Sequence, residues 1–210
     1  MKKKVLASVL TTMAVGASVA TLPAAPASAA QGTRSLATVL AADGNRFDRN
    51  WNDFDVLDRA VRTVLKTKPD SAVGVLADGS QRLTAFLPTD LAFRRLVHDL
   101  TGVRARTERG TFVRLARAAG VDTIEQVLLY HVVPGATITY RQAKRSDGAV
   151  LTTAAGPIIR VNVRGNGLVG LQDRDFNDKN AVVKPRLTNI NKGNRQIAHG
   201  INRVLRPANL

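Results

Sequence analysis

Residues Thr84 to Leu96 read T-A-F-L-P-T-D-L-A-F-R-R-L, and this stretch predicts a strand that passes directly into a helix. The apolar run from Leu83 to Leu87 predicts the strand, and Pro88 ends it because proline has no N–H to donate to a neighbouring strand. Thr89 or Asp90 can then cap the following helix through a side-chain oxygen. That helix is indicated by apolar residues at helical spacing, namely Phe93, Leu96, Val97 and Leu100.

The N-terminal segment has the pattern of a cleavable export signal. Lys2, Lys3 and Lys4 precede an uncharged stretch at 5–22, and Ala27-Ser28-Ala29 fits a small-x-small cleavage site. A membrane anchor is the alternative, but serine, threonine and glycine dilute the apolar stretch. No later segment is apolar over a membrane-spanning length. We therefore expect a signal peptide at 1–29 and a secreted mature protein without a transmembrane segment.

The rest of the chain has the length of a single domain. We expect an N-terminal extension with a short helix at 30–50 and the domain itself at 51–210. Helical patterns dominate as far as about residue 130, and short β-type runs follow it. Strands are predicted at 149–153, 158–163, 168–171, 182–184 and 187–190. The chain has no cysteine, so a hydrophobic core alone must stabilise the fold.

The protein is strongly basic. Its 31 lysine and arginine residues against 16 acidic residues give a net charge of +15, and removal of the three leader lysines leaves +12. This charge favours attraction to a polyanion, such as a cell-wall polymer or an acidic polysaccharide. The alternative is that dispersed arginines serve solubility, since only the segment 104–117 is densely basic. We expect no nucleic-acid partner, because nine aromatic residues are too few for a base-stacking surface.

Signatures of common catalytic sites are missing from the sequence. Three scattered histidines and no cysteine offer no zinc site at a usual spacing. The chain contains neither a Gly-x-Ser-x-Gly turn nor a glycine-rich phosphate loop. We therefore expect a protein that is not an enzyme.

Two segments carry oxygen-bearing side chains at alternate positions, an arrangement that calcium favours. The residues are Asp48, Asn50 and Asn52 in the first segment and Asp173, Asp175 and Asn177 in the second. Neither segment is an EF-hand, because the glycine at the sixth place and the glutamate at the twelfth are missing. The alternative is a pair of Asx turns that cap adjacent structure. We expect no cofactor, with weak calcium binding as the open alternative.

Three segments, in order, resemble the fasciclin-like domain family. They are the strand-to-helix stretch 84–96, L-Y-H-V-V-P-G at 129–135, and I-A-H-G-I-N-R-V-L-R-P at 197–207. The likeness spans about residues 51–207. Two departures occur in the third segment: Asn202 stands where the family usually has Asp, and Arg195-Gln196 where it usually has Asn-Gly.

The resemblance implies an α+β fold, in which a β-sheet wedge or sandwich has helices packed on one side. It also implies a non-enzymatic adhesion module that contacts an extracellular protein or a cell-envelope polysaccharide. In some animal members the Tyr-His segment is linked to receptor binding, and Tyr130 and His131 match that segment.

The other family-motif candidates for binding are Thr89, Asp90, His199 and Asn202. Each of these has a structural alternative as a helix cap or an internal hydrogen-bonding group. For Tyr130 and His131, we expect neighbouring positions on a strand, with one side chain facing inward.

Overall fold

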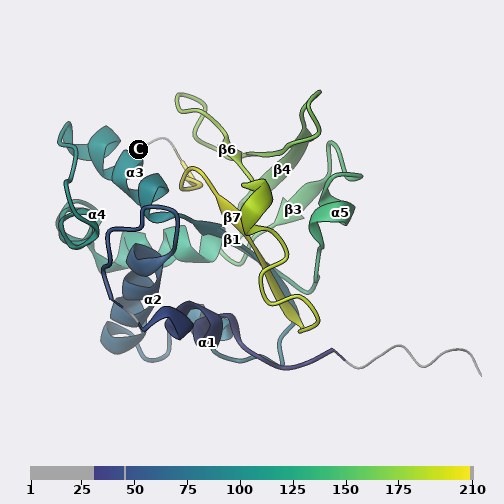
Figure 1. The fold of residues 1–210 in the computed structure, drawn as a ribbon, viewed down its shortest axis with the longest axis horizontal. Coiled ribbons are helices and arrows are strands. Elements are labelled where there is room, and N and C mark those ends of the chain that lie inside the picture. Colours follow the sequence, from purple (N-terminus) through teal and green to yellow (C-terminus); the bar gives the residue numbers. More distant parts are fainter. Residues whose placement is uncertain (1–30, 45, 209–210) are drawn as a thin grey trace, which may run out of the picture. The chain divides into compact units, whose positions relative to one another are not determined.

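The computed structural model describes residues 31–44 and 46–208. The expected signal peptide at 1–29 lies outside the described residues. Figure 1 shows the helices gathered on one side of the described chain, except the short α5 (Tyr140–Ala143), which lies on the side of the four-stranded sheet. Strands β1 (Leu83–Pro88) and β7 (Gln196–Ile201) lie between the two sides. This arrangement confirms the α+β class with helices packed on one side.

A three-stranded sheet at the centre unites the three segments singled out in the sequence. Strand β1 (Leu83–Pro88) pairs antiparallel with β2 (Val132–Pro134) and parallel with β7 (Gln196–Ile201). Every residue of β1 is buried, because the strand has neighbours on both edges and on both faces. The predicted strand therefore exists, and it runs through Pro88 rather than stopping before it.

The helical layer covers one face of this sheet. Its members are α1 (Leu36–Leu40), α2 (Asp55–Thr67), a 3₁₀ helix (Ala72–Leu76), α3 (Asp90–Thr101) and α4 (Glu108–Tyr130). Ser35 caps α1 by accepting a hydrogen bond from the Thr38 N–H, as expected for a serine at that position. Gly120 breaks the helical geometry within α4 at φ 72° and ψ 168°, a conformation that only glycine adopts readily.

The second sheet covers the other face of β1. It consists of four antiparallel strands, β3 (Val150–Thr152), β4 (Ile158–Val163), β5 (Val169–Gln172) and β6 (Ala181–Val182). A short helix, α5 (Tyr140–Ala143), precedes it in the chain. Most predicted strands of this region are confirmed within one or two residues, although the predicted strand at 182–184 is only the short β6.

Two local expectations are wrong. No strand forms at 187–190, where a 3₁₀ helix (Pro185–Leu187) is followed by a single bridge between Ile190 and Ala198. Tyr130 does not lie on a strand, because α4 continues through it and His131 is the C-terminal cap of that helix. The residues of this segment have a high β-propensity, which is why the sequence predicts a strand. Packing on the sheet stabilises them in a helix instead.

Across residues 31–44 and 46–208, no helix combines the length and the apolar character needed to cross a membrane.

Candidate functional site

Thr89 and Asp90 lie where α3 begins, but neither caps that helix through its side chain. Thr89 occupies the N-cap position, and its buried hydroxyl has no hydrogen-bond partner among the described residues. Asp90 Oδ1 instead accepts a hydrogen bond of 3.0 Å from the Val56 N–H in the first turn of α2. The expected cap is therefore wrong, because the carboxylate caps the neighbouring helix.

Tyr130 and His131 are both buried and form internal hydrogen bonds. The Tyr130 hydroxyl donates to the Ile158 carbonyl at 2.8 Å, and burial raises the pKa of this phenol to about 12. His131 Nδ1 lies 2.6 Å from the Val127 carbonyl, and its Nε2 accepts from the Leu205 N–H at 2.9 Å. Burial lowers the pKa of His131 to about 4, so the imidazole is neutral at pH 7.

His199 and Asn202 connect β7 to its surroundings. His199 Nδ1 accepts from the Asn189 N–H at 3.2 Å, and Nε2 lies 2.8 Å from the Ile138 carbonyl. Asn202 Oδ1 accepts from the Val182 N–H at 2.8 Å, which ties the end of β7 to β6. The family-motif residues thus hold elements together, and their contacts favour structural roles over direct contact with a partner.

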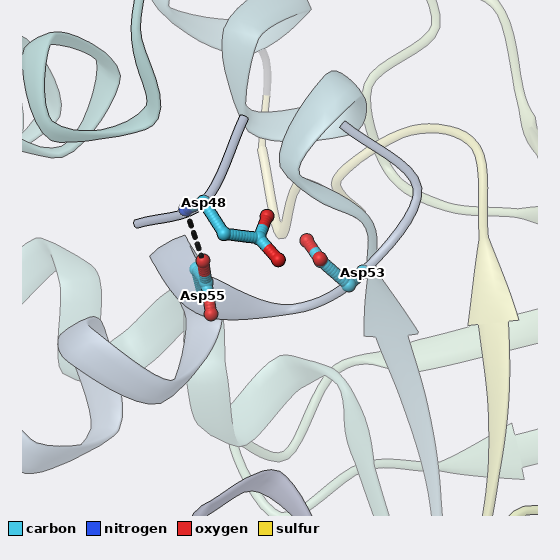
Figure 2. A group of neighbouring side chains, drawn as sticks. All are labelled: Asp48, Asp53 and Asp55. Carbon is cyan, nitrogen blue, oxygen red and sulfur yellow. Dashed lines mark hydrogen bonds between the residues drawn. The ribbon is translucent and has the colours of Figure 1, made fainter. Parts of the chain in front are cut away.

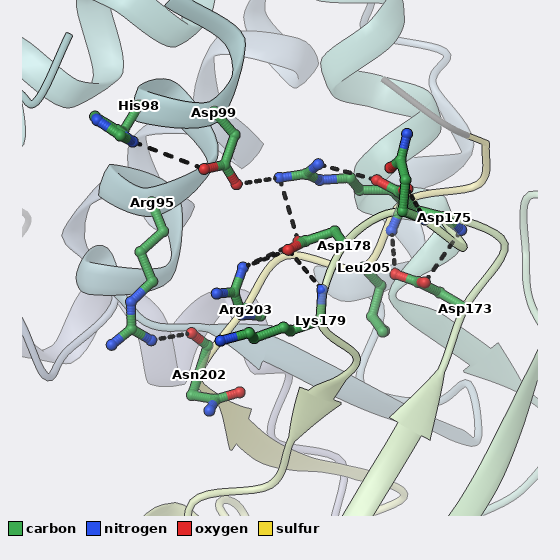
Figure 3. Close-up of polar contacts among 12 residues, drawn as sticks. Arg95, His98, Asp99, Asp173, Asp175, Asp178, Lys179, Asn202, Arg203 and Leu205 are labelled. Atoms are coloured by element: carbon green, nitrogen blue, oxygen red, sulfur yellow. Dashed lines mark hydrogen bonds and ion pairs between the residues drawn. The ribbon is translucent and has the colours of Figure 1, made fainter. Parts of the chain in front are cut away.

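The second oxygen-rich loop is neutralised by an arginine. Arg206 donates from Nη1 to Asp175 at 2.9 Å and from Nη2 to Asp99 at 2.7 Å, while its backbone N–H donates to Asp173 at 2.8 Å. Figure 3 shows the carboxylates of Asp99, Asp173 and Asp175 in this network. Since the Arg206 guanidinium already binds Asp175 and backbone N–H groups already bind Asp173, this loop is a poor candidate for a metal ion. This role of Arg206 is not predicted by the sequence, because Asp99, Asp173 and Asp175 lie far from it in the chain.

The first oxygen-rich loop uses its asparagines internally. Asn50 Oδ1 accepts from the Asn52 N–H at 3.3 Å, and Asn52 Oδ1 accepts from Lys184 Nζ at 2.7 Å. The carboxylate of Asp48, the third member of this loop, lies close to those of Asp53 and Asp55. One oxygen of each of these three carboxylates lies within 4.8 Å of the others. Figure 2 shows the Asp48 and Asp53 carboxylates facing each other.

Asp53 also belongs to a deeper group with Asp90 and Glu108, in which one oxygen of each residue again lies within 4.8 Å of the others. Burial raises the pKa of Asp90 to about 8 and that of Asp53 to about 6. Sequence reasoning missed this group, because its members come from three segments of the chain.

An arginine-rich hollow of about 350 Å³ lies on the outer side of α3. It is lined by Leu91, Arg94, Arg95, His98, Asp99, Arg104 and Arg203. Burial, together with the nearby Arg203 charge, lowers the pKa of Arg95. Among the described residues, Arg104 forms no side-chain hydrogen bond or ion pair, so its guanidinium is available to a ligand. We name this feature the α3 arginine pocket.

Contacts within the protein hold two of these guanidinium groups in place. Arg94 Nε donates to the Ala105 carbonyl at 2.8 Å, and its guanidinium lies 4.5 Å from the centre of the Trp51 ring. Arg95 Nη1 donates to the Asn202 carbonyl at 2.8 Å. The sequence signalled only part of this pocket, through the basic segment that begins at Arg104.

Comparison with known proteins agrees with this architecture. A family model described as "Fasciclin domain" matches residues 60–207. The solved FAS1 domain pair from the insect cell adhesion molecule fasciclin I is similar, with a TM-score of 0.53, 15% identity and coverage of 83% of this chain and 51% of that chain. The chain thus spans about half the length of that structure, and at this identity the likeness shows the fold. No curated protein matches the chain.

Proposed function

The chain belongs to the fasciclin domain family, and from this premise we propose that it is a secreted, non-enzymatic binding module that contacts an acidic partner at the cell surface or in the matrix. Domains of this family are adhesion-type modules and are typically extracellular. The insect structure similar to this chain comes from a cell adhesion molecule. This similarity supports a binding role and leaves the partner to be inferred from the surface of this chain.

The observation that carries the proposal is the α3 arginine pocket. Four arginines line one hollow, and the net positive charge of the chain, +15 in full and +12 once the expected leader is removed, surrounds it with a positive field. Arginine binds carboxylate, sulfate and phosphate groups through two parallel N–H donors. An acidic polysaccharide of the cell envelope is the partner that we favour. An extracellular protein with an acidic surface offers the same groups and remains the second candidate.

Chromatography on a sulfated polysaccharide column tests the pocket. Arg95→Gln/Arg104→Gln should elute at lower salt than the parent protein. The control variant, Arg141→Gln/Arg145→Gln, removes the same charge from exposed positions in and just after α5. We expect the control to elute close to the parent, because surface attraction is screened by salt and only convergent contacts persist. Equal elution of the two variants would show that general charge, not the pocket, retains the protein.

The polysaccharide and protein alternatives are separated by capture from the native envelope before and after digestion of its polysaccharide. Loss of binding after polysaccharide digestion supports our proposal, whereas loss after protease treatment alone favours an acidic protein. Secretion is tested by the mass of the protein in the culture medium. We expect a chain that begins near residue 30, and an exported protein with an intact leader contradicts this part of the proposal.

A further inference from the structure

Three carboxylates meet where three helices begin. Asp53 lies two residues before α2, Asp90 is the first residue of α3, and Glu108 is the first residue of α4. One oxygen of each lies within 4.8 Å of the others. Asp90 follows Asp53 by 37 positions in the chain, and Glu108 follows Asp90 by 18 positions. The tertiary fold therefore creates this cluster. We name it the three-helix carboxylate cluster.

Each carboxylate of the cluster has a buried oxygen that accepts no hydrogen bond from residues 31–44 and 46–208. Asp90 is 0% exposed and Glu108 is 1% exposed. Asp90 Oδ1 and Glu108 Oε2 accept hydrogen bonds from the Val56 and Arg49 N–H groups. Asp90 Oδ2, Glu108 Oε1 and Asp53 Oδ1 are buried and have no hydrogen-bond partner among the described residues. A buried carboxylate oxygen without a partner is costly, so this arrangement points to a missing positive group.

The part of the chain that the structure describes supplies no cation to this cluster. Within residues 31–44 and 46–208, no lysine, arginine or histidine forms an ion pair with Asp53, Asp90 or Glu108. One carboxyl oxygen of Asp53 and one of Asp90 lie within 4.8 Å of each other, although both groups are acceptors when ionised. Only a proton or a cation between them makes such a contact favourable. The helix N-termini contribute partial positive charge, which does not neutralise three carboxylates.

We propose that Asp53, Asp90 and Glu108 bind a divalent cation, and that calcium is the ion. The donors are all carboxylate oxygens, which suit calcium or magnesium rather than zinc or copper. Calcium–oxygen distances of about 2.3–2.6 Å keep any two ligand atoms of one ion no more than about 5.2 Å apart, and the oxygens of the cluster lie within 4.8 Å of one another. Calcium also tolerates irregular geometry, whereas magnesium requires a near-ideal octahedron.

Asp48 connects this buried cluster to solvent. It is exposed, and its carboxylate shares a second group of close oxygens with Asp53 and Asp55 (Figure 2). Asp48 can therefore add a ligand from the open side, and water can complete the coordination. The proposed site shares only Asp48 with the alternating loop at 48–52, because the side-chain oxygens of Asn50 and Asn52 have partners of their own.

Calcium binding to the mature protein is tested by native mass spectrometry and by thermal unfolding after treatment with a chelator. We expect one bound calcium per chain and a melting temperature that rises with each tenfold increase in calcium, because the ion binds the folded state. Magnesium should produce a smaller rise at equal concentration. An unchanged melting temperature in millimolar calcium, with no bound ion in the mass spectrum, would show that a shared proton alone occupies the cluster.

The variant Glu108→Gln separates ion binding from folding. The glutamine oxygen can still accept from the Arg49 N–H, while one of the crowded charges is lost. We expect this variant to melt no lower than the chelator-treated parent and to bind calcium at least tenfold more weakly. Asp70→Asn is the matched control, since Asp70 is exposed and lies outside the cluster, and it should respond to calcium like the parent.

The variant Asn50→Ala tests the alternating loop as a competing site. We expect it to bind calcium with the affinity of the parent, because Asn50 lies outside the cluster. If Asn50→Ala abolishes binding while Glu108→Gln retains it, the loop at 48–52 is the site and our proposal is wrong.

Discussion

Arg206 is a single side chain that joins two distant parts of this fold. It stands in the last of the three family segments, and it pairs with Asp175 in the loop after β5 and with Asp99 on α3. Its side chain is 5% exposed and that of Asp175 is 1% exposed, so the pair is withdrawn from water. Two elements that are far apart in the chain are thus joined at one guanidinium.

Replacement of Arg206 should therefore be costly. We expect Arg206→Ala to lower the free energy of unfolding by about 3–5 kcal/mol, because Asp175 remains buried without its cation. Arg203→Ala is the comparison, since the Arg203–Asp178 pair is about one-fifth exposed on each side and should contribute about 1 kcal/mol or less. Urea unfolding measures both values, and similar losses for the two variants would contradict the special role of Arg206.

Thr89 is a second residue whose contribution can be measured. Its hydroxyl is buried without a partner, so Thr89→Val should leave the free energy of unfolding unchanged or raise it by up to about 1 kcal/mol. Ser35→Ala should instead cost about 1 kcal/mol, because the Ser35 hydroxyl does cap α1. A loss above about 1 kcal/mol for Thr89→Val in urea unfolding would mean that the hydroxyl caps α3 in solution.

At the scale of elements, β1 separates two cores. Leu83, Ala85 and Leu87 contribute to the core formed with the helices, whereas Phe86 contributes to the core formed with the second sheet. This division follows from the two-residue repeat of a strand, which points successive side chains to opposite faces. The helix that follows β1 returns to the first core through Phe93.

The two cores can be probed separately through their phenylalanines. Phe86→Ala and Phe93→Ala should each lower the free energy of unfolding by about 3–5 kcal/mol, since both rings are buried and their removal leaves a cavity. Chemical denaturation followed by circular dichroism measures the effect. A loss below about 1 kcal/mol for either variant would show that its ring does not support a core.

At the scale of the whole molecule, His131 links the helical layer to the C-terminal segment. Its ring contacts the Val127 carbonyl within α4 and the Leu205 N–H after β7. The ring is buried and neutral, since burial lowers the pKa of His131 to about 4. Unfolding exposes the same histidine, whose pKa then returns to about 6.5.

This difference predicts a pH dependence of stability. Between pH 6.5 and pH 4 the unfolded chain binds a proton at His131 that the folded chain does not, so stability falls as the pH is lowered. We expect the stability difference between the parent and His131→Gln to shrink by about 2 kcal/mol from pH 7 to pH 5. Comparison with the variant subtracts the contributions of other titrating groups. A constant difference across this range, measured by urea unfolding, would rule out a depressed pKa at His131.

Much of the fold could be predicted from local sequence. The strand from Leu83, the helix after Pro88 and the cap at Ser35 all depend on residues within a few positions of one another, and the structure contains all three. The residues around Tyr130 favour a strand, and the packing of Tyr130 in the core that includes the second sheet overrides that preference.

The chain's sequence by itself determined the periodicity of its elements, its family and its positive charge, because each is a property of residue type and spacing. Only the tertiary structure decided that Asp90 caps α2, that Arg206 neutralises the second acidic loop, and that three carboxylates from separate segments meet at one point. Such contacts join residues many positions apart. Their energy depends on burial and on distance in space, and neither quantity can be read from the sequence alone.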